Sequence, residues 1–356
     1  MRNSDHRKWQ GLDNAVVLAE GVFGSTYGKT ANGLVRYSRR YRITSVIDSR
    51  YSGKDAGQIL SGKPNGVPII SSLKDALTGG ANTIIVGVAT DGGFLPAAFR
   101  PFISDALKAG MNVVSGLHEF LSDDREFAPL AAKTGAVITD VRKMFRDMKN
   151  PFTGEIENVR ATRIAVLGTD SAIGKRTTSV FLNEAMNRIG RKSIMIGTGQ
   201  TAWMQGFKYT VVTDAMINDF ISGNLESITV RAWNEEKPDF MFIEGQGSII
   251  HPAYAGSFEI LGACRPKYVV LQHAPRRLFF DGFEQFRIPE LARYIKAIEL
   301  LADTKVIAIS INGEGMKGEE ISESINKTHQ ETGLPAFDPL SDLTDVAEYI
   351  SGLDGS

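Results

Sequence analysis

The chain has 356 residues with 40 basic and 41 acidic side chains, which excludes the strong positive field by which many proteins attract nucleic acid or anionic membranes. Its length favours two or three domains, and the single cysteine, Cys264, cannot form a disulfide within the chain. No apolar run approaches the roughly 20 residues of a membrane span, and the polar segment from Met1 to Asp13 lacks the apolar core of a signal peptide. These features together predict a cytoplasmic protein.

The first 150 residues alternate short apolar runs with intervals of helical length. The predicted strands cover residues 15–19, 42–47, 84–88, 112–115 and 136–139, and the clearest helix covers 102–109. Strands that alternate with helices favour a parallel, doubly wound sheet whose ligand lies at the carboxyl ends of the strands. The sequence therefore predicts a Rossmann-like N-terminal domain over residues 1–150.

Asp48 follows the second predicted strand, where dinucleotide-binding folds place the acid that holds a ribose. The preceding turn, from Gly21 to Lys29, does not have the G-x-G-x-x-G spacing, so this sheet is expected to serve a ligand other than NAD. Lys29 and Arg36 belong either to a solvated helix face or to a site for a small carboxylate or phosphate. His118, after the fourth strand, is read mainly as a structural hydrogen-bonding residue.

Residues 142–158 are polar and contain Pro151 and Gly154, which predicts a linker and a second domain over residues 151–356. This domain begins with a buried strand at 163–167, a glycine-bounded loop from Gly168 to Gly174, and a helix that opens with Lys175. Loop N–H groups, a helix N-terminus and a lysine are the features that hold phosphates. The sequence therefore predicts an α/β domain of the P-loop NTPase type.

The phosphate loop departs from the usual motif in two ways. Five residues instead of four separate its glycines, and Arg176 stands directly after the lysine, where Ser or Thr normally contacts Mg²⁺. The hydroxyl that would contact Mg²⁺ is thus displaced by one position, which disfavours metal-assisted nucleotide hydrolysis. Phosphate binding by backbone N–H groups is unaffected, because it needs no particular side chain. We expect cofactor-binding residues throughout the motif: Gly168, Thr169, Asp170, Ser171, Gly174, Lys175, Arg176, Thr177 and Thr178.

Later strands are predicted at 193–196, 239–243, 268–271, 305–311 and 335–339. Glu244 comes directly after an apolar strand downstream of the phosphate loop, an arrangement that serves metal, water or a proton. His251 lies close in sequence to the same exit. Gln200 belongs to the glycine-rich exit of the strand at 193–196, and Asp214 comes further along the chain after it. The chain has no Cys/His spacing typical of a metal site.

Several motifs in order carry a resemblance to a known family. They are Gly168 to Thr178, Thr198-Gly-Gln-Thr201, Glu244-Gly-Gln-Gly-Ser248 and His251-Pro252, with Gly28-Lys-Thr-Ala31 and Gly116-Leu-His118 in the first half. Together they resemble the DgcN-type D-glutamate N-acetyltransferase family, P-loop proteins first described as a domain of unknown function. The central domain is also similar to dethiobiotin synthetase, from which Arg176 departs.

This resemblance implies acetyl transfer from acetyl-CoA, as co-substrate, to the amine of a D-amino acid, with D-glutamate as the expected acceptor. The reaction needs a base and donors for the oxyanion. Glu244, Asp214 and His251 are the candidate bases, and the backbone N–H groups near Gly199 or Gly247 are candidate donors. Mg²⁺ is possible but not implied, and no metal-binding residue is assigned.

We expect a division of labour in which the second domain holds acetyl-CoA while Lys29, Arg36 and Gln200 bind the acceptor across an interdomain cleft. We also expect a homo-oligomer with a small-molecule substrate and with no nucleic-acid or membrane partner. Two alternatives remain open: an ATP- and Mg²⁺-dependent ligase or kinase of the dethiobiotin synthetase type, and a nucleotide-sensing protein without turnover.

Overall fold

The computed structural model describes residues 12–353, which divide into two compact units. One unit contains the chain up to Asp147 together with Gln200–Lys208, and the other contains Met148–Gly199 and the chain from Tyr209 onward. The division predicted from the sequence placed a single boundary at residue 150 and did not foresee the excursion at Gln200–Lys208. Most of the N-terminal segment, residues 1–11, in which no signal peptide was predicted, lies outside the described residues.

The first unit is built on a parallel sheet of six strands among its described residues. The strand order is β3-β2-β1-β4-β5-β6, the order of dinucleotide-binding folds, which confirms the predicted Rossmann-like domain. The strands are β1 (Asp13–Leu18), β2 (Tyr41–Ile47), β3 (Ile69–Ile70), β4 (Thr83–Val86), β5 (Asn112–Ser115) and β6 (Ile138–Asp140).

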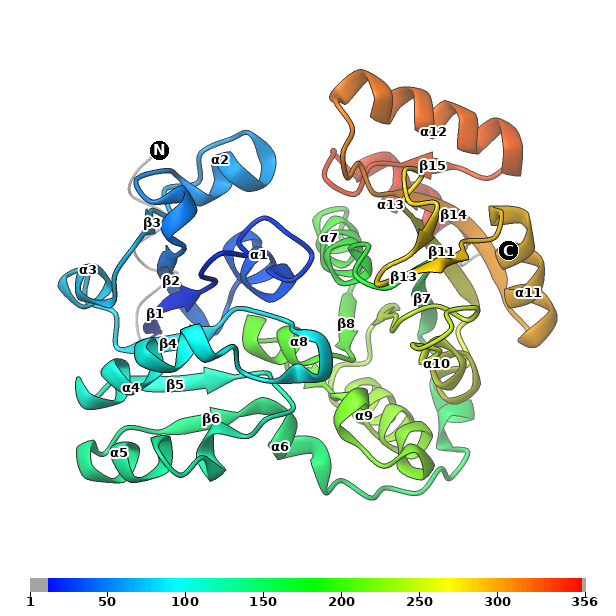
Figure 1. Cartoon of the computed structure of the whole chain (residues 1–356). Coiled ribbons are helices and arrows are strands. Elements are labelled where there is room, and N and C mark those ends of the chain that lie inside the picture. The colour runs from blue at the N-terminus through cyan, green and yellow to red at the C-terminus, as the bar shows by residue number, and fades with distance from the viewer. Residues whose placement is uncertain (1–11, 354–356) are drawn as a thin grey trace. The chain divides into compact units, whose positions relative to one another are not determined.

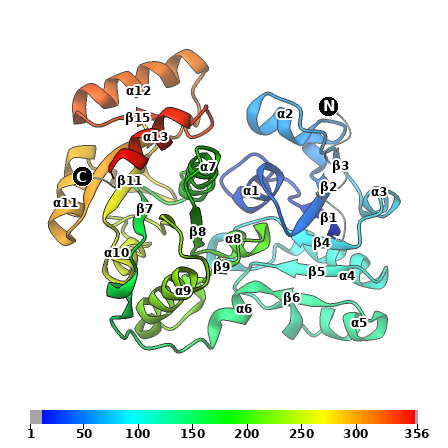
Figure 2. The same ribbon diagram turned by 180° about the vertical axis from the view of Figure 1, so that it is seen from behind.

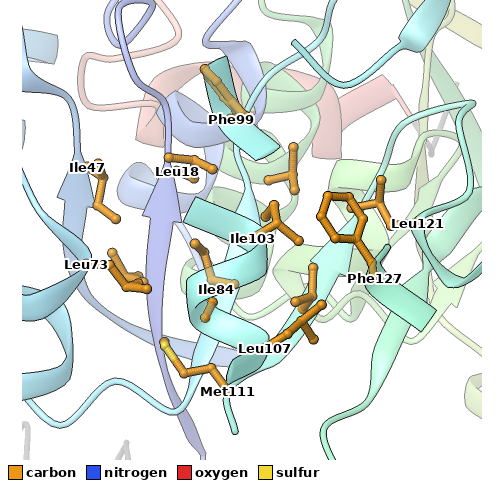
Figure 3. Packing of buried hydrophobic residues seen from close by; sticks show 14 of the residues in the cluster. Leu18, Ile47, Leu73, Ile84, Phe99, Ile103, Leu107, Met111, Leu121 and Phe127 are labelled. Atoms are coloured by element: carbon orange, nitrogen blue, oxygen red, sulfur yellow. The ribbon is translucent and has the colours of Figure 1, made fainter. Parts of the chain in front are cut away.

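Helices cover both faces of this sheet (Figure 1). They are α1 (Lys29–Arg36), α2 (Ala56–Ser61), α3 (Leu73–Thr78), α4 (Arg100–Lys108), α5 (Phe127–Thr134), α6 (Val141–Arg146) and α8 (Gln200–Gln205). One buried cluster joins Leu18 and Ile84 of the sheet to Ile103 of α4 and Phe127 of α5 (Figure 3). Along each strand these side chains alternate with residues that point to the opposite face of the sheet. Helices cover that face as well, so each central strand is buried on both faces.

The second unit contains a parallel sheet in the order β15-β14-β11-β7-β10-β8-β9, counting only residues that the structure describes. The first strand, β7, lies in the centre between β10 and β11, which is the position from which a phosphate loop starts in P-loop folds. The strands are β7 (Thr162–Gly168), β8 (Ser193–Gly197), β9 (Tyr209–Thr210), β10 (Phe240–Glu244), β11 (Tyr268–His273), β14 (Lys305–Ile311) and β15 (Ala336–Phe337).

The helices of this unit pack on its sheet, with α7 beside α13 and α9 beside α10 (Figure 2). They are α7 (Lys175–Arg188), α9 (Ile221–Glu236), α10 (Ser257–Cys264), α11 (Leu291–Leu301), α12 (Gly318–Thr332) and α13 (Thr344–Gly352). Leu182 and Met186 of α7 meet Ile350 of α13 over the strand residues Ile164 and Val166. This apolar layer holds α7, the helix that follows the phosphate loop, against the sheet.

Two features of this unit were not predicted. A short antiparallel hairpin, β12 (Phe279–Phe280) with β13 (Phe283–Arg287), follows the exit of β11. Residues 213–220 form two separate 3-10 turns, Thr213–Ala215 and Asn218–Phe220, before α9 begins, so the candidate base Asp214 lies outside that helix.

Candidate active site

The glycine-bounded loop joins the centre of the second sheet to the first turn of α7. β7 ends at Gly168, Gly174 takes the position before the helix with φ of 95°, and Lys175 is the first helical residue. Ala172 also has a positive φ, 49°, which costs energy for a residue with a Cβ atom. Backbone that alternates in this way directs N–H groups into a concave surface, and the positive end of the helix dipole adds to it. The loop is therefore shaped to bind an anion.

The side chain of Lys175 is held inside the loop. Its stem passes between two glycines: a Cβ atom added at Gly168 would lie 2.9 Å from Lys175 Cδ, and one added at Gly245 would lie 3.0 Å from it. The buried ammonium donates to the carbonyl oxygen of Asp170 at 2.6 Å. The charge that the motif requires is thus fixed beside the loop backbone.

The side chain of Asp170 holds the phosphate loop in its shape through hydrogen bonds and an ion pair. Its buried carboxylate accepts from the N–H groups of Ser171 at 2.7 Å and Asp281 at 3.1 Å, and it pairs with Arg277 Nη1 at 3.0 Å. Burial alone would raise the pKa of Asp170, but hydrogen bonds from His251, Arg277 and Ser171 outweigh it and lower the pKa. The carboxylate is ionised and fully engaged, so it ties the hairpin to the phosphate loop.

His251 is buried beside Asp170 within an aromatic cluster of Tyr254, Phe280 and Phe283. Its Nδ1 accepts from the N–H groups of Ala253 at 3.1 Å and Tyr254 at 3.0 Å, so this nitrogen carries no proton. Its Nε2 lies 3.4 Å from Asp170 Oδ1. Both ring nitrogens therefore face groups of the protein.

Glu244 ends β10 and pairs in register with Val166 of β7, next to the phosphate loop. Its Oε2 accepts from the N–H of Thr198 at 3.0 Å, and its Oε1 lies 3.9 Å from Arg176 Nη1. Burial raises the pKa of Glu244, and the positive charges of Arg176 and Lys175, with hydrogen bonds from the backbone of Thr198 and Gly199, offset part of that rise. The structure therefore brings Glu244 and Arg176, two of the predicted site residues, into one ion pair.

Three hydroxyl groups of the motif, those of Thr169, Ser171 and Thr178, have partners within the protein. Thr178 donates to Gln272 of β11 and lies 3.2 Å from the hydroxyl of Ser310 on β14. Thr169 lies 3.2 Å from His273 Nδ1, and Ser171 donates to Asp281. Burial lowers the pKa of His273 to about 4, so this ring is neutral near pH 7. Thr178, although predicted to bind cofactor, contributes to packing between helix and sheet.

Asp214 is the exposed residue of a 3-10 turn that is tied to the exit of β8. Thr213 donates its N–H at 3.1 Å and its hydroxyl at 3.3 Å to the carbonyl oxygen of Thr198. Thr198 in turn donates to Glu244, and its hydroxyl accepts from Gln246 Nε2 at 2.8 Å. A chain of hydrogen bonds thus links the segment that carries Asp214 to the carboxylate at the end of β10.

The predicted acceptor-binding residues all belong to the first unit, but Arg36 lies apart from Lys29. Lys29 begins α1 and Arg36 ends it, about 10 Å away at 1.5 Å per residue; Arg36 donates to the carbonyl oxygen of Leu60 at 3.4 Å. Gln200 lies against Thr30, with Nε2 3.5 Å from the Thr30 hydroxyl. Their binding role stays a prediction.

Sequence reasoning missed several polar residues around these groups. Arg277 lies six residues beyond the predicted strand at 268–271, near a strand exit, a position that could have drawn attention to it. Gln246 belongs to the motif Glu244-Gly-Gln-Gly-Ser248, but no feature of the sequence indicated a role for this residue. Arg142, 3.5 Å from Gln200 Oε1, was read as part of a linker.

Two searches of the described residues gave negative results. No helix within residues 12–353 is both long enough and apolar enough to cross a membrane. In the same part of the chain, no group of three or more His, Cys, Asp or Glu side chains is arranged to hold a metal ion.

Comparison with known proteins matches both units. Residues 150–347 match the family described as a domain of unknown function, DUF1611_C, a P-loop domain. Residues 49–144 match DUF1611_N, described as a Rossmann-like domain of unknown function. A crystal structure of a DUF1611 family protein from Anabaena variabilis is similar over 96% of this chain and 99% of that one, with a TM-score of 0.87 and 30% sequence identity.

Two curated proteins named D-glutamate N-acetyltransferase are similar over most of their length. The protein from Tritonibacter scottomollicae is 31% identical over 277 residues, which cover 75% of this chain and 80% of that protein. The protein from a Pseudoalteromonas species is 33% identical over 280 residues, which cover 77% of this chain and 82% of that protein.

Proposed function

The chain belongs to the DUF1611 family and is an acyltransferase, and we propose that it moves an acetyl group from acetyl-CoA to the amine of D-glutamate. The observation that carries this proposal is the similarity to two proteins named D-glutamate N-acetyltransferase, at 31% and 33% identity. The geometry of the phosphate loop is compatible with it, because coenzyme A carries a diphosphate.

The loop from Gly168 to Gly174 is the proposed site for that diphosphate. Its backbone N–H groups and the first turn of α7 supply hydrogen-bond donors, and Lys175 supplies a point charge. On binding, a phosphate oxygen would replace the Asp170 carbonyl as the acceptor for the ammonium. The loop then anchors the coenzyme and needs no chemical step of its own.

The reaction forms an amide nitrogen–carbon bond and breaks the carbon–sulfur bond of the thioester. The acceptor attacks as a neutral amine, so the ammonium form must first lose a proton to a base. The tetrahedral intermediate then expels the coenzyme A thiolate, which takes up a proton to become the free thiol. The products are N-acetyl-D-glutamate and coenzyme A.

Among the three candidate bases, exposure favours Asp214. His251 is buried, and its Nδ1 already accepts two hydrogen bonds. Glu244 is buried between Arg176 and the Thr198 N–H. Asp214 is exposed at the same edge of the sheet, where an acceptor amine can reach it. We therefore assign proton removal to Asp214, with Glu244 as the alternative base.

The test measures release of free thiol from acetyl-CoA with a thiol-reactive dye. We expect thiol release that depends on both the protein and D-glutamate, with L-glutamate as the matched control. A second arm replaces acetyl-CoA with ATP and Mg²⁺ and measures ADP and phosphate. ADP formation without thiol release would contradict the proposal and would support the ligase or kinase alternative.

A further inference from the structure

P-loop nucleotide sites hold Mg²⁺ between two protein groups. One is the Ser or Thr hydroxyl directly after the lysine, and the other is the acid at the end of a neighbouring strand. In this chain the residue after Lys175 is Arg176, and the acid is Glu244. The position that normally supplies a hydroxyl ligand for Mg²⁺ is therefore occupied by a positively charged side chain in this chain.

The geometry of Arg176 and Glu244 also argues against a bound metal ion. Arg176 Nη1 lies 3.9 Å from Glu244 Oε1, and their side chains are only 17% and 5% exposed. Glu244 Oε2 already accepts from the N–H of Thr198 at 3.0 Å. A metal ion bound to this carboxylate would stand next to a buried guanidinium and would be repelled by it.

The two neighbouring hydroxyls do not restore the missing ligand. Thr178 is buried against the sheet, with its hydroxyl directed to Gln272 and Ser310. Thr177 is one residue further along α7 than Arg176, so its side chain points about 100° away from that of Arg176 around the helix axis. The residues present therefore do not fit Mg²⁺.

We propose that the guanidinium of Arg176, held by Glu244, takes the place of the divalent cation and adapts the loop to a diphosphate free of metal. The planar guanidinium presents its N–H donors in a fixed arrangement that suits phosphate oxygens. Lys175 and Arg176 then give the loop two adjacent cations. The identity of the natural ligand, coenzyme A, rests on the function proposed above.

In this arrangement Glu244 is a positioning residue for Arg176. The carboxylate reduces the cost of burying the guanidinium and fixes its direction. Arg176 is a specificity-determining residue, because it distinguishes a free diphosphate from a metal-bound one. This assignment predicts an effect that loss of packing alone would not produce, namely a change in the metal dependence of binding.

The experiment is calorimetric titration of the full chain with coenzyme A and, separately, with ADP, each in EDTA and in excess Mg²⁺. Arg176→Thr restores the usual Gly-Lys-Thr sequence, and Arg176→Lys keeps the charge as a matched control. We expect wild type to bind coenzyme A with the same Kd, within about twofold, in both buffers. We expect Arg176→Thr to bind about 10- to 100-fold more weakly in EDTA, the range of a charged hydrogen bond. Mg²⁺ should restore part of this loss, whereas Arg176→Lys should keep most of the wild-type affinity in EDTA.

Wild-type binding that requires Mg²⁺ would overturn the inference, and so would unchanged affinity of a folded Arg176→Thr in EDTA. Circular dichroism of each variant identifies loss of fold, and in that case the metal dependence of wild type and Arg176→Lys decides. If wild type binds ADP but not coenzyme A, the proposed function fails. The ADP titrations in the two buffers then still decide whether Arg176 replaces the metal.

Discussion

Replacing Asp170 by asparagine tests whether this buried carboxylate maintains the phosphate loop. The substitution keeps the size of the side chain but replaces one of the two oxygens that accept from Ser171, Asp281 and Arg277 with an amide donor. Removing one partner of a buried ion pair costs about 3–5 kcal/mol when the other charge is left alone. Arg277 is not left alone, because its Nη2 also pairs with Glu314 at 2.7 Å. We therefore expect Asp170→Asn to lower the free energy of unfolding by about 2–3 kcal/mol.

The measurement is urea unfolding followed by circular dichroism, with Glu314→Gln as the matched control. Both carboxylates pair with the same guanidinium, but Glu314 is 47% exposed and Asp170 is fully buried. Solvent screening limits an exposed pair to less than about 1 kcal/mol. A loss below about 0.5 kcal/mol for Asp170→Asn, or equal losses for the two variants, would refute the reasoning.

The pH dependence of this difference has a definite sign. The pKa of Asp170 is lowered in the folded protein, so its ionised form stabilises the fold above the unfolded pKa of about 4. That stabilisation is lost as the pH falls through the folded pKa. The difference in stability between wild type and Asp170→Asn should therefore be constant near neutral pH and shrink below about pH 4.

Three further substitutions test the binding and catalytic assignments. Lys175→Ala should weaken coenzyme A binding by about 1–3 kcal/mol in a calorimetric titration, and unchanged affinity in a folded variant would remove Lys175 from the site. Asp214→Asn should lower kcat about 10²-fold with little change in the Kd of coenzyme A. Glu244→Gln should instead raise the Kd of coenzyme A about tenfold, because Arg176 loses the carboxylate that positions it, while kcat stays within about tenfold of wild type. The opposite pattern in the last two variants would assign the base to Glu244.

The sequence predicted the fold where apolar runs and glycine-bounded exits occur together. The predicted strand at 163–167 corresponds to β7, and the strand at 305–311 matches β14 at both ends. The two-residue strands β3 and β9 were missed, since segments so short show no hydrophobic period. The hairpin β12–β13 was missed because β13 is mostly exposed and contains polar residues. The helix at Gln200–Gln205 was missed as a member of the first unit, because membership depends on tertiary contacts alone.

The candidate site was predictable in its motifs but not in its pairings. The order of residues in the motif indicates that Lys175 follows the loop and that Glu244 ends a strand, but not that Arg176 turns toward Glu244. The sequence also gives no sign that Asp170 meets Arg277, more than 100 residues later, or that both nitrogens of His251 face groups within the protein. These pairings depend on how adjacent strand exits are placed side by side at one edge of the sheet.

The central claim is tested most directly by following a labelled acetyl group. The full chain is incubated in EDTA with D-glutamate and acetyl-CoA that carries ¹³C in the acetyl group, and the amino-acid fraction is analysed by mass spectrometry. The account predicts N-acetyl-D-glutamate that carries the label, formed without ATP and without added metal. Label that remains on coenzyme A while the protein is folded, or product that forms only when ATP and Mg²⁺ are supplied, would contradict it.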